Sequence, residues 1–193
     1  MFVAFALVAV AVLYRVAIAI SGIGESLGAF NFAPLGAIAL CGAVYLPRRI
    51  ALVVPLVALA LSDVVLNGMH YHAPLLSWEM GVRYAALAMS GVLGVWVRSR
   101  PGMFRLLGAS VAGSLLFYAT TNTASWWTDA GYAKTWAGWV QALTLGLPGY
   151  PPTFAFYQNT LAGDLLFTLL FAGCMALGAR AVAAREASSG VRA

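Results

Sequence analysis

Residues 2–21 read FVAFALVAVAVLYRVAIAIS, an apolar run in which the charged side chain is Arg15. A helix of about 20 apolar residues crosses the roughly 30 Å hydrocarbon layer of a membrane. The rest of the chain is similar, because 62% of its 193 residues are apolar and 9% are charged. Soluble domains carry roughly a quarter charged residues. The composition therefore excludes a soluble protein and predicts an integral membrane protein.

Further apolar runs, bounded by proline, arginine and polar clusters, predict an all-α fold, a polytopic bundle of six transmembrane helices. The expected spans are residues 2–21, 33–46, 50–67, 75–97, 104–124 and 160–184. The second is short for a perpendicular crossing, and Pro55 is expected to kink the third. We expect one transmembrane domain, residues 1–184, and a short polar cytoplasmic tail, residues 185–193.

The long connection between the last two expected spans, residues 125–159, is rich in aromatic side chains. Residues 134–145 are expected to form a short interfacial helix. Loops of this length are usually functional or disordered, and bulky aromatic side chains argue against disorder. We therefore expect an ordered outer cap over the bundle. Its tryptophans and tyrosines are Trp126, Trp127, Tyr132, Trp136, Trp139, Tyr150 and Tyr157.

The arginines predict the orientation, because short loops rich in Arg stay cytoplasmic. With both termini in the cytoplasm of a bacterial inner membrane protein, most basic residues fall on one side. These are Arg48, Arg49, Arg98, Arg100, Arg105, Arg180, Arg185 and Arg192. The net charge of +5 is spread between apolar runs and does not indicate nucleic-acid binding. A cleavable signal peptide ending near Ala17-Ile18-Ala19 is the alternative, but no basic residue precedes the apolar run.

With this orientation, acids, amides and imidazoles gather on the outer side. Asp63 with Asn67, and Thr160 with Asp164, are four residues apart and share a helix face. Asp63 lies about 20 Å across a layer of about 30 Å, so it should face the bundle interior or a wet cavity. We hypothesise an outward-facing, aromatic-capped cavity for a small polar solute. Its candidate binding residues are Asn31, Asp63, Asn67, His70, His72, Glu79, Arg83, Asn122, Trp126, Trp127, Tyr157, Asn159 and Asp164.

These residues also have structural interpretations. Outer tryptophans are normal in membrane proteins, and Glu79 with Arg83 can be a helix-stabilising pair. In a scaffold or assembly subunit the carboxylates and amides would form a closed polar network, with no cavity above roughly 300 Å³. His70 and His72 could hold a metal, but two histidines without a third ligand are more often ordinary loop residues. We expect no metal and no cofactor.

Enzymatic activity is not expected. The sequence has no G-x-x-x-x-G-K-[ST], H-E-x-x-H or G-x-S-x-G motif. The catalytic alternative uses Asp63, His70 or Glu79 as acid and base, and requires these groups within hydrogen-bonding reach of one another. Cys41 and Cys174 lie in apolar runs and are interpreted as packing residues.

Four segments carry a resemblance to a known family: Asn31–Leu40 (NFAPLGAIAL), Pro55–Asp63, Lys134–Gly138 (KTWAG) and Asn159–Leu166 (NTLAGDLL). The chain resembles an uncharacterised bacterial family of six-helix proteins assigned to membrane transport. That family is similar in size and layout to the substrate-binding S-components of energy-coupling factor vitamin transporters. The resemblance implies uptake of a vitamin-like solute by a bundle that topples in the membrane.

The same resemblance implies partners: membrane lipid, and an energy-coupling transmembrane subunit with its ATPase. Coupled S-components dock through an A-x-x-x-A motif in the first helix, which this chain lacks there, whereas Ala39 and Ala43 have that spacing in the second span. The departure leaves open a solitary transporter, similar to those that take up cobalamin, in which His70 or His72 would meet the cobalt. Other small-residue spacings predict internal packing or a homo-oligomer face. They are Ala86, Ser90 and Gly94, and Ala109 and Gly113.

Overall fold

The computed structural model describes residues 2–28 and 31–190, which form helices and loops with no β-strand among them. The predicted all-α class is confirmed for these residues. Five helices are long and apolar enough to cross a membrane. They are α1 (Phe2–Ser21), α4 (Val53–Leu66) with its π-helical continuation η1 (Asn67–Tyr71), α5 (Trp78–Val97), α6 (Met103–Thr128) and α8 (Thr153–Gly190).

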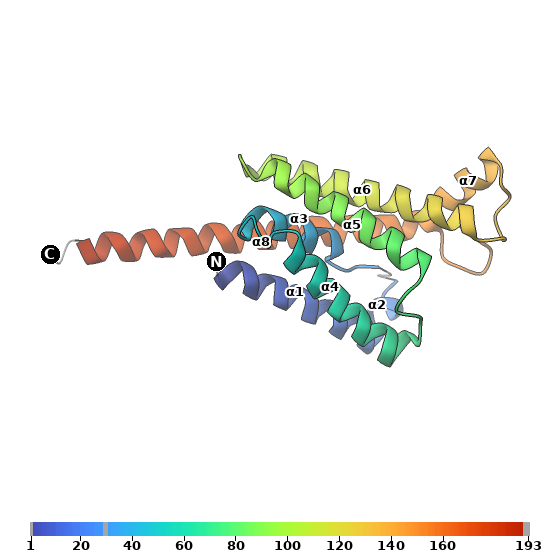
Figure 1. The fold of residues 1–193 in the computed structure, drawn as a ribbon, viewed down its shortest axis with the longest axis horizontal. Helices are drawn as coiled ribbons and strands as arrows, with labels where there is room; N and C mark the ends of the chain where they lie inside the picture. The colour runs from blue at the N-terminus through green and yellow to red at the C-terminus, as the bar shows by residue number, and fades with distance from the viewer. Residues whose placement is uncertain (1, 29–30, 191–193) are drawn as a thin grey trace.

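The short helix α3 (Leu35–Tyr45) lies at the centre of the bundle and packs against α5, α6 and α8 (Figure 1). Most of its residues are buried. At about 1.5 Å per residue, its 11 residues span about 16 Å, roughly half of the hydrocarbon layer. The described residues just before it, 31–34, are non-helical, and a short helix, α2 (Ile23–Ser26), precedes them in the chain. The predicted second span is therefore a buried half-helix, an arrangement that membranes tolerate where protein surrounds the irregular backbone.

Small residues let these helices approach closely. A Cβ atom at Gly94 would lie 2.4 Å from the carbonyl oxygen of Leu40, and one at Gly113 would lie 2.9 Å from Oγ of Ser90. Ala39 and Ala43 are fully buried in the same interface. Their spacing therefore serves packing inside the bundle, and this pair is not exposed to a coupling subunit.

Helix ends differ from the prediction in several places. The connection between α6 and α8 covers residues 129–152 and contains α7 (Trp136–Leu143), because both long helices extend beyond the predicted ends. The expected tail after residue 184 is helical to Gly190, since its alanine-rich sequence favours a helix. Pro55 lies in the first turn of α4, where its missing N–H interrupts the run of i→i−4 hydrogen bonds in which Val54 and Leu56 donate to Ile50 and Leu52. Cys41 is buried as predicted, but Cys174 is exposed.

The long helices form two groups. α1 packs on α4, whereas α5, α6 and α8 surround α3. Figure 1 shows the chain ends, the α3–α4 turn and the α5–α6 turn at one end of the molecule. The α4–α5 and α6–α8 connections lie at the other end. This second end brings together most of the polar residues singled out in the sequence.

Candidate functional site

Asp164 of α8 lies in the middle of the bundle, 1% exposed, at the N-terminus of α3. Its Oδ1 accepts from the backbone N–H of Ala37 at 2.9 Å, and its Oδ2 accepts from the hydroxyl of Ser114 at 2.7 Å. The first N–H groups of a helix lack partners within the helix and favour negative charge. Asp164 therefore supplies, from another helix, the cap that the residue before α3, Pro34, does not provide.

Gly36 makes this cap possible. A Cβ atom at Gly36 would lie 2.4 Å from Oδ2 of Asp164, so any larger side chain would displace the carboxylate. One turn further along α8, the Thr168 hydroxyl donates to Oγ of Ser110 at 3.3 Å. Hydrogen-bonded polar side chains therefore continue between α6 and α8 beyond Asp164. We call this row, Ser114 and Ser110 of α6 with Asp164 and Thr168 of α8, the polar seam.

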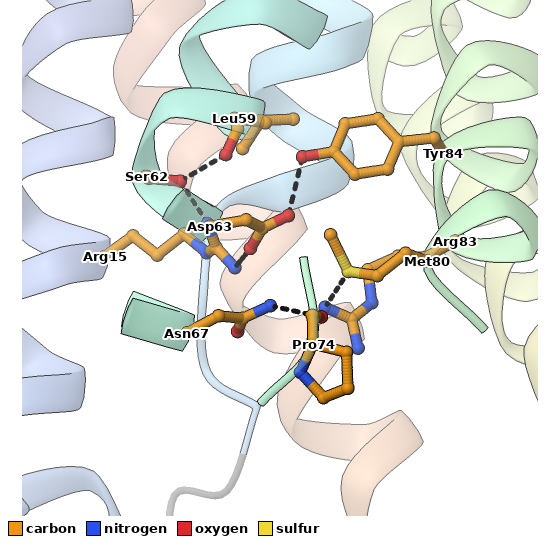
Figure 2. Close-up of polar contacts among 9 residues, drawn as sticks. All are labelled: Arg15, Leu59, Ser62, Asp63, Asn67, Pro74, Met80, Arg83 and Tyr84. Atoms are coloured by element: carbon orange, nitrogen blue, oxygen red, sulfur yellow. Dashed lines mark hydrogen bonds and ion pairs between the residues drawn. The ribbon is translucent and has the colours of Figure 1, made fainter. Parts of the chain in front are cut away.

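Asp63 of α4 is the second buried carboxylate and forms an ion pair with Arg15 of α1 (Figure 2). Arg15 donates to Oδ1 of Asp63 at 2.5 Å and also to Oγ of Ser62, and the Tyr84 hydroxyl donates to Oδ2 of Asp63 at 2.6 Å. Asp63 is 3% exposed and Arg15 is 8% exposed. Buried charges persist only when paired and hydrogen-bonded. The cluster therefore ties α1, α4 and α5 together.

A cleft of about 650 Å³ separates α4 from α5 beside this cluster. Asp63, Tyr84 and Ser77 provide its polar groups. Its remaining lining is apolar: Ala60, Val64, Leu75, Leu76, Trp78, Met80 and Gly81.

A second cavity, of about 350 Å³, lies where α6 ends and α8 begins, against the loop that follows α7. The centroids of the Tyr118 and Tyr157 rings in its wall are 4.7 Å apart. Asn31, Asp129 and Tyr150 in its lining are exposed, so the cavity communicates with the outside. The other lining residues are Phe117, Thr121, Asn122, Ser125, Tyr132, Gly146, Leu147, Pro151, Thr153, Phe156 and Thr160.

Local contacts hold the walls of this cavity. The Tyr118 hydroxyl donates to the carbonyl oxygen of Leu143 in α7, and Nδ2 of Asn122 donates to the carbonyl oxygen of Tyr118 at 2.8 Å. Burial, and then the nearby carboxylate of Asp129, raise the pKa of Tyr132. Its hydroxyl therefore stays protonated at neutral pH and can donate a hydrogen bond.

The predicted binding residues do not share one cavity. Asn31, Asn122 and Tyr157 line the 350 Å³ cavity, whereas Asp63 lines the cleft. Asp164 lies one helical turn beyond Thr160, enclosed by its own hydrogen bonds.

Three further predicted residues secure loops. Nδ2 of Asn67 donates to the carbonyl oxygen of Pro74 at 3.4 Å, and Nδ2 of Asn159 donates to that of Gly28 at 2.9 Å. Nε1 of Trp126 donates to the carbonyl oxygen of Ala133 at 2.9 Å. These contacts order the ends of helices and leave none of the three in the lining of either cavity.

The remaining predicted residues lie apart from both cavities. Arg83 contacts Sδ of Met80 at 3.6 Å rather than Glu79. His70, His72, Glu79 and Trp127 are exposed. Within residues 2–28 and 31–190, no three His, Cys, Asp or Glu side chains are grouped closely enough for a metal ion. The partners of Asp63 are Arg15 and Tyr84, so the structure does not assemble the acid and base groups of the catalytic alternative.

Sequence reasoning missed Arg15 and Tyr84 as partners of Asp63, and most of the hydroxyl groups that line the cavity. Two signals were present. Tyr118 with Asn122, and Thr160 with Asp164, are polar pairs at helical spacing, and one member or both of each pair lines the cavity. Tyr132 and Tyr150 belong to the aromatic connection.

The sequence profile of a family of unknown function, DUF6580, matches residues 1–186. No curated protein and no solved structure matches the chain.

Proposed function

Since the chain belongs to the DUF6580 family, whose members have no assigned function, we propose a function from the cavity itself. The protein is a membrane uptake protein that binds a small polar solute between α6, α8 and the loop after α7. One observation carries this proposal: a cavity of about 350 Å³ combines aromatic rings with hydroxyl and amide groups from separate parts of the chain. Sites for small molecules typically enclose about 300–1,000 Å³ and combine apolar walls with a few polar groups.

The polar seam beneath the cavity supports uptake over surface binding alone. Thr160 lines the cavity, and Asp164 and Thr168 follow it at successive turns of α8. Ser114 and Ser110 of α6 face them through the hydrogen bonds described above. Polar groups within a membrane bundle often mark a substrate path. In this state the hydrogen bonds close the path, and passage of a solute would require α6 and α8 to separate at Ser114.

The proposed setting is a bacterial inner membrane with both termini in the cytoplasm. The α3–α4 and α5–α6 turns, at the same end as the termini (Figure 1), carry Arg48, Arg49, Arg98 and Arg100. Arginine-rich short loops stay in the cytoplasm, so the cavity would open outward. In this proposal α3 and the non-helical residues before it complete a sixth crossing. An energy-coupling partner, if used, would dock outside the buried Ala39–Ala43 pair.

A scaffold is the second candidate, and one observation favours it. Every buried side-chain nitrogen and oxygen of the described residues has a hydrogen-bond partner, as a closed polar network requires. However, a scaffold needs no cavity above roughly 300 Å³, and cavities of about 350 and 650 Å³ are present. Uptake is therefore the better-supported proposal.

Native mass spectrometry of the full chain, extracted from its own membranes, tests the proposal. We expect a co-purifying small molecule, which then raises the unfolding temperature of protein freed of it. Tyr157→Leu should remove that rise, because the Tyr157 ring forms part of the cavity wall. Tyr71→Leu is the matched control, since Tyr71 is exposed outside the cavity. If no small molecule co-purifies, or if Tyr157→Leu leaves the ligand-induced rise unchanged, the proposal is wrong.

A further inference from the structure

The charged side chain in the lining of the 350 Å³ cavity is negative. It is the carboxylate of Asp129, and none of the described lining residues is Lys, Arg or His. Lys134 is not a lining residue, and its Nζ donates to the backbone carbonyl oxygens of Trp126 and Asp129. The cavity therefore offers a bound molecule negative charge and no side-chain cation.

The Asp129 carboxylate is held in place at the rim. Its Oδ1 accepts from the backbone N–H of Gly131 at 2.7 Å, in the turn that follows α6. Asp129 is exposed, so its charge is hydrated in the empty cavity. A bound cation would meet a carboxylate that is already oriented.

Aromatic rings also line the cavity. Phe117, Tyr118, Phe156 and Tyr157 come from α6 and α8, and Tyr132 and Tyr150 come from the loops. The face of an aromatic ring carries negative potential, which attracts cations by about 0.5–2 kcal/mol. Protein sites for quaternary ammonium groups use such clusters of rings.

We propose that the solute is a small organic cation, with a quaternary ammonium or protonated amine group held between the tyrosine rings and Asp129. This inference rests on the proposed function, because it names the substrate class of that cavity. An anion would lose hydration beside Asp129 without meeting a cationic side chain. A neutral molecule would fill the cavity but would gain no electrostatic attraction from the Asp129 carboxylate or from the faces of the rings.

Binding of matched probes to the full chain in detergent tests the charge requirement. The cationic probes are tetramethylammonium, choline and benzyltrimethylammonium, and 3,3-dimethylbutan-1-ol is the neutral isostere of choline. We expect at least one cation to bind, and expect choline to bind at least about tenfold more tightly than its isostere if choline is that cation. Asp129→Asn should weaken the cation about tenfold while leaving unfolding of the unliganded protein unchanged, because Asp129 is exposed. Glu79→Gln, an exposed carboxylate outside the cavity, is the control.

The outcomes separate this inference from the proposed function. Equal binding of choline and its isostere, binding unaffected by Asp129→Asn, or binding of none of the three cations would overturn the cation assignment. A co-purifying neutral or anionic molecule that depends on Tyr157 would also overturn it, while leaving uptake intact. Absence of any co-purifying molecule, by contrast, would count against the proposed function itself.

Discussion

Asp63 and Asp164 are both carboxylates buried within membrane-length helices, yet the protein neutralises them in different ways. Asp63 is held by the guanidinium of Arg15 and the hydroxyl of Tyr84. Asp164 is held by the backbone N–H of Ala37 and the hydroxyl of Ser114. The first carboxylate meets a full positive charge, whereas the second meets dipoles at the N-terminus of α3.

The difference assigns them different structural tasks. The Arg15–Asp63 pair joins α1 to α4, and Tyr84 adds α5. Asp164 of α8 joins the buried half-helix α3 to α6 and α8 through its hydrogen bonds to Ala37 and Ser114. It lies one helical turn beyond Thr160, which lines the cavity. A charge pair can be replaced by two apolar side chains. The backbone N–H partner of Asp164 cannot be exchanged by substitution, and its side-chain partner, Ser114, carries no charge.

Arg15→Ala should have the largest effect on this comparison. It leaves Asp63 buried without its cationic partner, and removal of one member of a buried pair destabilises by about 3–5 kcal/mol. Equilibrium unfolding in detergent measures the loss. The double variant Arg15→Met with Asp63→Leu should recover most of it, because neither charge remains. A loss below about 1 kcal/mol for Arg15→Ala would show that the pair does not hold α1 on α4.

Tyr84→Phe should have a smaller effect, because the ion pair stays intact. It removes one hydrogen bond to a carboxylate, worth about 1.5–3 kcal/mol. Tyr71→Phe, at an exposed tyrosine, should leave the unfolding free energy unchanged. If the two variants behave alike, then water in the neighbouring cleft replaces the Tyr84 hydroxyl and α5 is not secured by it.

Gly36→Ala tests the other carboxylate. Its Cβ atom would lie 2.4 Å from Oδ2 of Asp164, so the carboxylate must move away from α3. Overpacking of this kind typically costs about 1–3 kcal/mol. Gly108→Ala in α6 is the control, because nothing lies within 4 Å of the added Cβ and alanine favours a helix. Equal unfolding temperatures for both variants would refute the close contact between Asp164 and α3.

The sequence was sufficient for the helices and for the burial of both carboxylates. Each long apolar run became a helix, since only that backbone satisfies its own polar groups in a membrane. An uncompensated charge facing lipid costs several kcal/mol, which predicted that Asp63 and Asp164 point inward. The sequence also contained a sign of the ion pair. Arg15 and Asp63 each lie about 20 Å along spans that run in the same direction, so the two side chains lie at the same depth in the membrane.

What the sequence lacked was the adjacency of the helices. Shared faces within one helix were readable from spacing, but nothing showed that α1 packs on α4 while α6 meets α8. The sequence analysis therefore placed Asp63, Asn122 and Asp164 in one cavity. In the structure Asp63 lines the cleft, Asn122 lines the 350 Å³ cavity, and Asp164 lines neither. The spacing of Glu79 and Arg83 likewise suggested a pair, although Arg83 turns to Met80.

Asp164→Asn should have the smallest effect of the stability variants, about 1 kcal/mol. The amide oxygen still accepts from the N–H of Ala37, and Ser114 can rotate its hydroxyl to accept from the new amide, so the main loss is charge at a helix N-terminus. Asp63→Asn changes the same atoms but leaves Arg15 as an unpaired buried cation, which predicts a loss several times larger. Unfolding of the two variants side by side measures this ratio. Equal losses of unfolding free energy would mean that both carboxylates are stabilised by the same kind of interaction. The distinction between an ion pair at Asp63 and helix N-terminal hydrogen bonds at Asp164 would then be wrong.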